Sequence, residues 1–185
     1  EQVWDDLDGQ ANGVVTMNSG NTISYATTMG GANVSANYNK QTSGGSSYSV
    51  GADIAPADGV MLFAAMADKY AGVNATTDEM TFGATYTTGA TTVGIQRSEQ
   101  DNESSSDVES TGIGVSYAVN DDLTISYGSH SLEKVGSDDQ ESVAIGASYT
   151  IGSLGVGLSM HSIDNVNNTS ADDREGYQMV LTFAF

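Results

Sequence analysis

Along most of the chain, apolar residues alternate with small or polar residues, and a period of two is typical of β-strands rather than helices. The clearest example is the segment 143–151, in which one face carries Val143, Ile145, Ala147, Tyr149 and Ile151. The whole pattern predicts eleven strands, at 21–28, 32–41, 47–55, 60–69, 79–88, 91–99, 110–119, 123–132, 141–151, 154–162 and 176–185. No stretch of about 18 apolar residues occurs, so the sequence predicts no transmembrane helix.

The connections between these strands alternate in length. The tight turns are Met29-Gly30-Gly31, Pro56-Ala57-Asp58-Gly59, Gly89-Ala90, Asn120-Asp121-Asp122 and Gly152-Ser153. The long loops are expected near 42–46, 70–78, 100–109, 133–140 and 163–175. Short turns at one end, long loops at the other and strands of about ten residues with one apolar face are typical of outer-membrane β-barrels. A soluble β-sandwich also alternates, but it does not need loops sorted by length.

Charged residues avoid the middle of the predicted strands. The chain has 24 acidic and five basic residues, and a net charge of −19. Most carboxylates fall in turns, loops, strand ends or the first eight residues; Asp53 is the main exception, and alternation places it on the polar face. The basic residues are each expected at or in a long loop, and none mid-strand; they are Lys40, Lys69, Arg97, Lys134 and Arg174. Since a basic residue on the lipid face costs about 2–4 kcal/mol at the bilayer midplane, this distribution favours a membrane barrel.

The composition excludes several other classes. A chain this acidic has no basic stripe with which to neutralise nucleic-acid phosphates. The absence of cysteine removes disulfide frameworks and thiolate metal sites. No assembled serine, histidine and acid can be identified, so no enzyme is expected. The chain begins at Glu1 without an initiator methionine or a signal peptide, so we expect it to be processed, truncated or partial.

Two segments resemble bacterial outer-membrane proteins. The stretch from Tyr177 to Phe185, YQMVLTFAF, resembles the terminal strand of that class, in which the barrel-assembly machinery reads a final Phe and alternate apolar residues. The resemblance makes Tyr177, Phe183 and Phe185 the expected assembly signal. The stretch ISYATTMGGANVSANY, from Ile23 to Tyr38, is similar to the hairpin that follows the constriction loop of general porins.

This resemblance implies an all-β protein, a transmembrane antiparallel up-and-down β-barrel with about 16 strands when complete, of which about 11 are present. A closed single-chain barrel needs an even strand number, so eleven strands leave an open edge. Residues 1–185 are expected to form one porin domain, with 1–20 in the place of the constriction loop and 21–185 as barrel strands. The expected function is passive diffusion of ions and small hydrophilic solutes, in a homotrimer that contacts lipid and lipopolysaccharide in a Gram-negative outer membrane.

The first eight residues hold the expected pore constriction, formed by Glu1, Asp5, Asp6 and Asp8. Carboxylates at a narrow point focus negative potential, which predicts a preference for cations. The alternative is an acidic loop that is exposed and does not contact the pore. Asp53, His130 and His161 are expected to face the lumen, with the two histidines at similar height and about 9–10 Å apart. A metal or proton site there competes with the simpler interpretation of two polar wall residues.

The long loops concentrate acid, most clearly at Glu99, Asp101, Glu103, Asp107 and Glu109. Oxygen ligands of this kind suit Ca²⁺ or Mg²⁺, although no spacing matches a defined calcium loop and solvated charge is the alternative. No other cofactor is expected. Two further functions remain open at this stage, a substrate-selective outer-membrane channel and a secreted acidic calcium-binding β-sandwich. The many Gly, Ala, Ser and Thr residues expected in the lumen argue for low specificity.

Overall fold

All eleven predicted strands are present in the computed structural model, which describes residues 21–40, 45–72, 75–103 and 106–183. Glu1, Asp5, Asp6, Asp8 and Phe185 lie outside the described residues. The strands are β1 (Asn21–Met29), β2 (Ala32–Lys40), β3 (Ser46–Ala57), β4 (Val60–Gly72), β5 (Ala75–Thr88), β6 (Thr91–Asn102), β7 (Val108–Ala118), β8 (Leu123–Lys134), β9 (Gln140–Ile151), β10 (Leu154–Asp164) and β11 (Arg174–Phe183). A short 3₁₀ turn, η1 (Val166–Asn168), follows β10.

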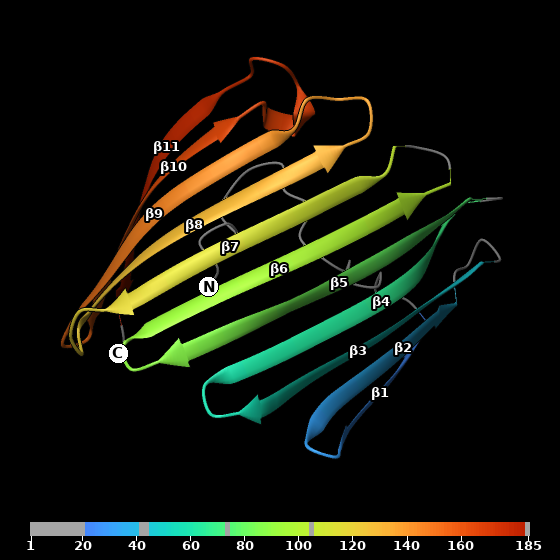
Figure 1. The fold of residues 1–185 in the computed structure, drawn as a ribbon, viewed down its shortest axis with the longest axis horizontal. Helices are drawn as coiled ribbons and strands as arrows, with labels where there is room; N and C mark the ends of the chain where they lie inside the picture. Colours follow the sequence, from blue (N-terminus) through green and yellow to red (C-terminus); the bar gives the residue numbers. More distant parts are fainter. Residues whose placement is uncertain (1–20, 41–44, 73–74, 104–105, 184–185) are drawn as a thin grey trace.

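The strands form one antiparallel sheet in which each strand pairs with the next along the chain (Figure 1). This confirms the predicted up-and-down topology. Within the described residues the sheet is not closed, since β1 and β11 lie at its opposite edges. In the same part of the chain, no helix is long and apolar enough to cross a membrane.

One face of the sheet is apolar and exposed, as the alternation predicts. Ile145 is 57% exposed and Met179 is 65% exposed, and the register keeps such residues together, as in the pairs of Ile95 with Ile113 and Val93 with Val115. The buried apolar side chains of the described residues are small in number: Ala67, Leu132, Ala144, Ile163 and Val166. A sandwich buries its apolar faces between two sheets. A single sheet with its apolar face outward therefore contradicts the sandwich alternative, and so broad an apolar surface calls for lipid.

The edge of this apolar face steps from strand to strand. Met80 is apolar on β5, but its partner on β6 is Glu99, and the apolar positions of β6 end at Ile95. A step of this kind is required when strands tilt relative to the membrane, because paired residues then lie at different heights. The strands consequently continue past the apolar face, and their outward positions become acidic toward the loop end.

The short turns are fixed by particular residues. Gly59 has a φ of 75°, and a Cβ atom there would lie 2.1 Å from the carbonyl oxygen of Thr87. The backbone N–H of Thr87 donates to the carbonyl of Gly59 at 2.8 Å, so only glycine fits this close approach. In the turn between β7 and β8, the side-chain oxygen of Asn120 accepts the N–H groups of Asp122 and Leu123, both at 2.9 Å.

Several predicted connections are too long; the loop expected near 100–109 covers only 103–107, because β6 extends to Asn102 and β7 begins at Val108. The long loop expected near 70–78 is largely strand, because β4 extends to Gly72, β5 begins at Ala75, and Lys69 pairs with Thr77. The turn expected at 56–59 is also shorter, because β3 runs through Pro56 to Ala57. The register is irregular between Ile54 and Ala57, a kind of position at which proline is tolerated in a strand.

Candidate functional site

The face opposite the apolar one is lined by small and polar residues. Glycines and hydroxyls succeed one another across the strands and border a hollow of about 720 Å³; they include Thr92, Gly114, Ser126, Ser148, Gly157 and Thr182. Small side chains leave space in front of the sheet, and hydroxyls can replace part of the hydration shell of a passing solute. We refer to this surface as the polar wall.

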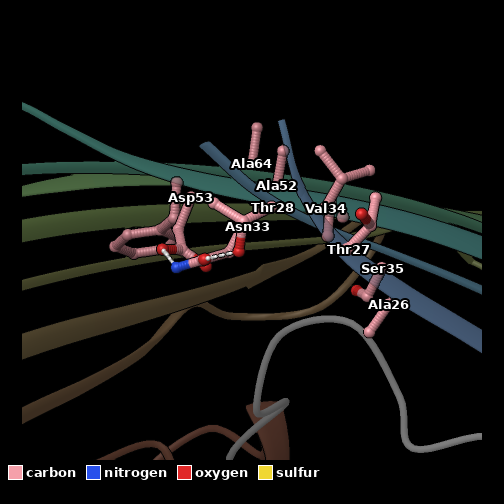
Figure 2. Close-up of a pocket in the computed structure, with 12 residues that line it drawn as sticks. Ala26, Thr27, Thr28, Asn33, Val34, Ser35, Ala52, Asp53 and Ala64 are labelled. Atoms are coloured by element: carbon pink, nitrogen blue, oxygen red, sulfur yellow. Dashed lines mark hydrogen bonds between the residues drawn. The ribbon is translucent and has the colours of Figure 1, made fainter. Parts of the chain in front are cut away.

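Asp53 lies on the polar wall in the middle of β3, as alternation predicts. Its carboxylate accepts a hydrogen bond from the side-chain amide of Asn33 at 2.9 Å, and the amide oxygen of Asn33 accepts one from the hydroxyl of Thr28 at 3.0 Å (Figure 2). These residues border a hollow of about 490 Å³. Phe63 is the direct cross-strand partner of Asp53 on β4. The carboxylate is therefore held by the amide of Asn33, while the ring of Phe63 extends toward Gly83 of β5.

Glu79 is a second carboxylate on the polar wall, and it was not among the expected lumen-facing residues. It lies in β5 between Ala67 of β4 and Gln100 of β6, and it is buried. The expected strand began at residue 79, so Glu79 was counted as a strand end. Its alternation with Thr81 and the other polar-wall positions of β5 was the available signal.

Hydrogen bonds cross the polar wall beside Glu79. The hydroxyl of Thr77 donates to the side-chain oxygen of Asn102 at 3.1 Å, and the hydroxyls of Thr81 and Ser98 lie 2.8 Å apart. The side-chain amide of Gln96 also donates to Ser98, at 3.4 Å. Such a network fixes side chains that would otherwise move freely into the space before the wall.

The two histidines share the polar wall but are not opposite each other. The Nε2 atom of His130 lies 3.2 Å from the hydroxyl of Ser110, and His130 pairs across the strands with Ser142. His161 pairs with Ala144, one polar-wall position away from Ser142, and its ring rests on Gly176. Two strand spacings and one two-residue step separate the backbones of the histidines by about 12 Å. Among the described residues, no group of three or more histidine or acidic side chains could hold a metal ion.

Comparison with known proteins gives this fold a family. The profile of Gram-negative porins matches residues 4–134. The chain belongs to the Gram-negative porin family. No curated protein sequence matched the chain. Since porins of Gram-negative bacteria reside in the outer membrane, the apolar face is a lipid-facing surface and the location is the cell outer membrane.

Solved porin structures share the fold at low sequence identity. An anion-selective porin from Comamonas acidovorans has a TM-score of 0.75 and 16% identity, over 89% of this chain and 59% of that chain. A mutant of Rh. blastica porin has a TM-score of 0.66 and 20% identity, over 89% and 55%. In-vitro folded OmpT of Vibrio cholerae, in a trimer form, has a TM-score of 0.62 and 17% identity, over 86% and 60%. The chain therefore spans 55% to 60% of the length of these porins.

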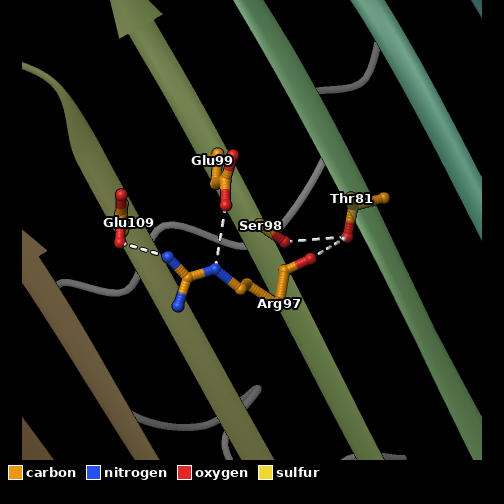
Figure 3. A network of polar contacts seen from close by, with 5 residues as sticks. All are labelled: Thr81, Arg97, Ser98, Glu99 and Glu109. Carbon is orange, nitrogen blue, oxygen red and sulfur yellow. Dashed lines mark hydrogen bonds and ion pairs between the residues drawn. The ribbon is translucent and has the colours of Figure 1, made fainter.

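The lipid-facing surface of this porin carries an ion-pair cluster around Arg97, and the prediction that Arg97 lies at a long loop is wrong. Arg97 lies in the middle of β6, not at a loop, and its guanidinium binds Glu99 at 2.8 Å and also Glu109 of β7 (Figure 3). The register aligns Arg97 with Phe82 and Thr111, so the cluster lies on the outward face just beyond the apolar positions. One charge-assisted contact to each of two carboxylates offsets part of the cost of a basic group so near lipid.

The described part of the expected assembly signal lies on the edge strand β11. Tyr177 is 77% exposed and Phe183 is 57% exposed, both on the lipid-facing surface. Within the described residues, the outer side of β11 has no strand partner. An unpaired edge with apolar side chains is the form in which a strand can be recognised by another protein.

Proposed function

We propose that the protein containing this chain is a channel for passive diffusion of ions and small hydrophilic solutes, rather than an enzyme. The observation that carries the proposal is the orientation of the two faces of the sheet. The apolar face is the outer, lipid-facing one, and the polar wall is the inner one. Phe63 is the one phenylalanine, tyrosine or tryptophan on the described polar wall, so there is no series of rings along which a particular substrate could slide. This favours a non-specific pore over a substrate-selective one.

The test is conductance of the purified full-length protein in a planar lipid bilayer. We expect stepwise current increases proportional to voltage and to salt concentration, without a requirement for a particular solute. Folded protein that inserts and produces no steps would contradict the proposal. Conductance that saturates at low concentration of one solute would instead favour the substrate-selective alternative.

We further propose that the pore prefers cations. Asp53 and Glu79 place negative charge on the polar wall, and Asp5, Asp6, Asp8 and Glu1 add more if residues 1–20 form the constriction loop. The similarity to an anion-selective porin lends this no support, and at 16% identity it concerns the fold alone. The zero-current potential across a tenfold salt gradient measures the preference, and a potential of anion-selective sign would reject it.

The remaining proposals concern assembly. Residues 1–185 form one domain, further strands from the rest of the protein close the sheet to about 16 strands, and the complete porin forms a homotrimer, as OmpT does in its trimer form. The barrel-assembly machinery reads Tyr177, Phe183 and Phe185. Native mass spectrometry of the full-length protein that reports only monomers would contradict the trimer.

At the loop end, we propose that Ca²⁺ or Mg²⁺ bridges the acidic loops to lipopolysaccharide phosphates, because both partners supply the oxygen ligands that these ions prefer. Lipopolysaccharide binding that does not change when EDTA removes the ions would reject this proposal.

A further inference from the structure

The loop between β10 and β11, residues 165–173, does not extend freely from the end of the sheet. Val166 at its start is completely buried, and it packs with Ile163 of β10, which is 2% exposed. Ile163 lies on the polar wall, because it pairs with Ser142 of β9. The loop therefore folds toward the polar wall and not toward the lipid-facing surface.

Hydrogen bonds attach the loop to the neighbouring strands. The backbone N–H of Asn167 donates to the side-chain oxygen of Gln140 at 2.8 Å, and Gln140 is completely buried on the polar wall of β9. The side-chain amide of Asn168 donates to the carbonyls of Leu132 at 2.8 Å and Asp138 at 2.9 Å. Leu132 pairs with Gln140, so these contacts reach sideways across β9 to β8.

The loop backbone is itself fixed in an unusual shape. Asn165, Asn167, Asn168 and Ala171 all have left-handed φ angles, between 54° and 60°. Asparagine tolerates this region better than most residues, which explains the run of asparagines in the sequence. The side-chain oxygen of Asn165 accepts the N–H of Ala171 at 3.1 Å, which closes the loop on itself.

We infer that residues 165–173 form a fixed lip that leans over the polar wall and narrows the loop-end mouth of the pore, and so set an upper size limit for entering solutes. The inference rests on the proposed channel function. The lip also carries two carboxylates: Asp172 pairs with Arg174 at 3.4 Å, and Asp173 adds negative charge where solutes enter. Its attachment through Gln140 and Asn168 keeps the opening constant instead of letting the loop open and close.

Cysteine labelling tests the position of the lip, since this chain contains no cysteine. Thr169 is exposed within the loop, so Thr169→Cys should fold normally. Reaction of the full-length Thr169→Cys porin with a bulky neutral thiol reagent should reduce single-channel conductance. The control is Glu133→Cys, at the same end of the sheet but on the lipid-facing surface, where it pairs with Glu109. The same reagent should leave its conductance unchanged.

Removing the side chains of Gln140 and Asn168 tests whether their hydrogen bonds hold the lip in place. The double variant Gln140→Ala/Asn168→Ala should show noisier open-channel current, and its size limit for neutral sugars or polymers should shift to larger solutes. Asn120→Ala, which removes an equally well bonded asparagine from a turn at the other end, serves as the control and should change neither. Resistance of the unboiled protein to denaturation on gels shows that each variant has folded.

The outcomes separate the two ideas. If the wild-type protein conducts and labelling of the Thr169→Cys porin leaves its conductance unchanged, the proposal of a lip is wrong. The channel proposal is then unaffected. A folded wild-type protein that does not conduct would overturn the channel proposal and the lip with it. Block by the reagent at residue 169 and not at residue 133 would support both.

Discussion

Gly83 offers a sharp test of how the polar wall is packed. It lies in β5, opposite Phe63, and a Cβ atom added there would lie 2.4 Å from the Phe63 ring and 2.5 Å from the backbone oxygen of Ile95. The ring can turn away, but the carbonyl belongs to the hydrogen-bonded ladder and cannot. We expect Gly83→Ala to lower the free energy of unfolding by about 1–3 kcal/mol, the usual cost of overpacking.

Gly176 provides the matched control on β11. A Cβ atom there would lie 2.3 Å from the ring of His161, and its three nearest atoms all belong to that side chain. Because His161 can rotate, Gly176→Ala should change the free energy of unfolding by no more than about 0.5 kcal/mol. Both substitutions restrict the unfolded chain equally, so the difference between them isolates the clash with the carbonyl.

The measurement is a urea titration of the full-length porin in lipid vesicles, followed by the mobility of folded and unfolded protein on unboiled gels. Equal midpoints for Gly83→Ala and Gly176→Ala would refute the reasoning. Adding Phe63→Ala to Gly83→Ala should recover only part of the loss, since the ring is removed and the Ile95 carbonyl remains. Full recovery would show that the ring alone caused the clash.

Three other changes have definite expected outcomes. Replacing Asp5, Asp6 and Asp8 together with Asn should move the zero-current potential toward the non-selective value, with conductance at high salt nearly unchanged; an unchanged potential would mean that residues 1–20 are not the filter. Asp53→Asn should produce a smaller shift in the same direction, because the proposed constriction would bring ions closer to its carboxylates than the polar wall does, and an unaltered potential at low salt would place Asp53 away from the ion path. Arg97→Gln leaves Glu99 and Glu109 directly opposite each other on the lipid-facing surface, so the urea midpoint should fall, and a midpoint equal to that of the wild type would show that the cluster adds no stability.

The strands could be predicted from the sequence because successive side chains point to opposite faces, and lipid selects apolar residues on one of the two. The same dependence explains the errors. Beyond the apolar face, outward positions such as Asp78 and Asp101 are acidic, so the alternation disappears although the ladder between β5 and β6 continues to the pair of Thr77 and Asn102. The hydrophobic pattern shows where a strand contacts lipid, whereas hydrogen bonds set the strand's length. The loop predicted at 70–78 is wrong because the two lengths differ there.

The wall could be predicted only in part. Asp53 stands out because apolar residues on both sides fix its face, while Glu79 has acid and polar neighbours that resemble a loop. The lip at 165–173 depends on side-chain contacts to Gln140 and to carbonyls of another hairpin, which no periodicity encodes. The run of asparagines suggests left-handed turns, but it does not give the direction in which the loop folds.

The extended strands also bring like charges together, and this leads to a last prediction. On the outward face, Asp68 pairs with Asp78, and Asp78 pairs with Asp101. Carboxylates directly across neighbouring strands, with Cβ atoms about 5 Å apart, repel each other.

Asp78→Asn removes both repulsions at once and should raise the urea midpoint in lipopolysaccharide-free vesicles at 0.01 M salt, where the Debye length is about 30 Å. At 1 M salt the Debye length is about 3 Å, and the advantage should vanish. Asp58→Asn, in the turn before Gly59, has no cross-strand carboxylate and should show no such dependence on salt. A gain for Asp78→Asn that is the same at both salt concentrations would mean that repulsion is not its cause, and that the acidic ends of these strands are tolerated without cost.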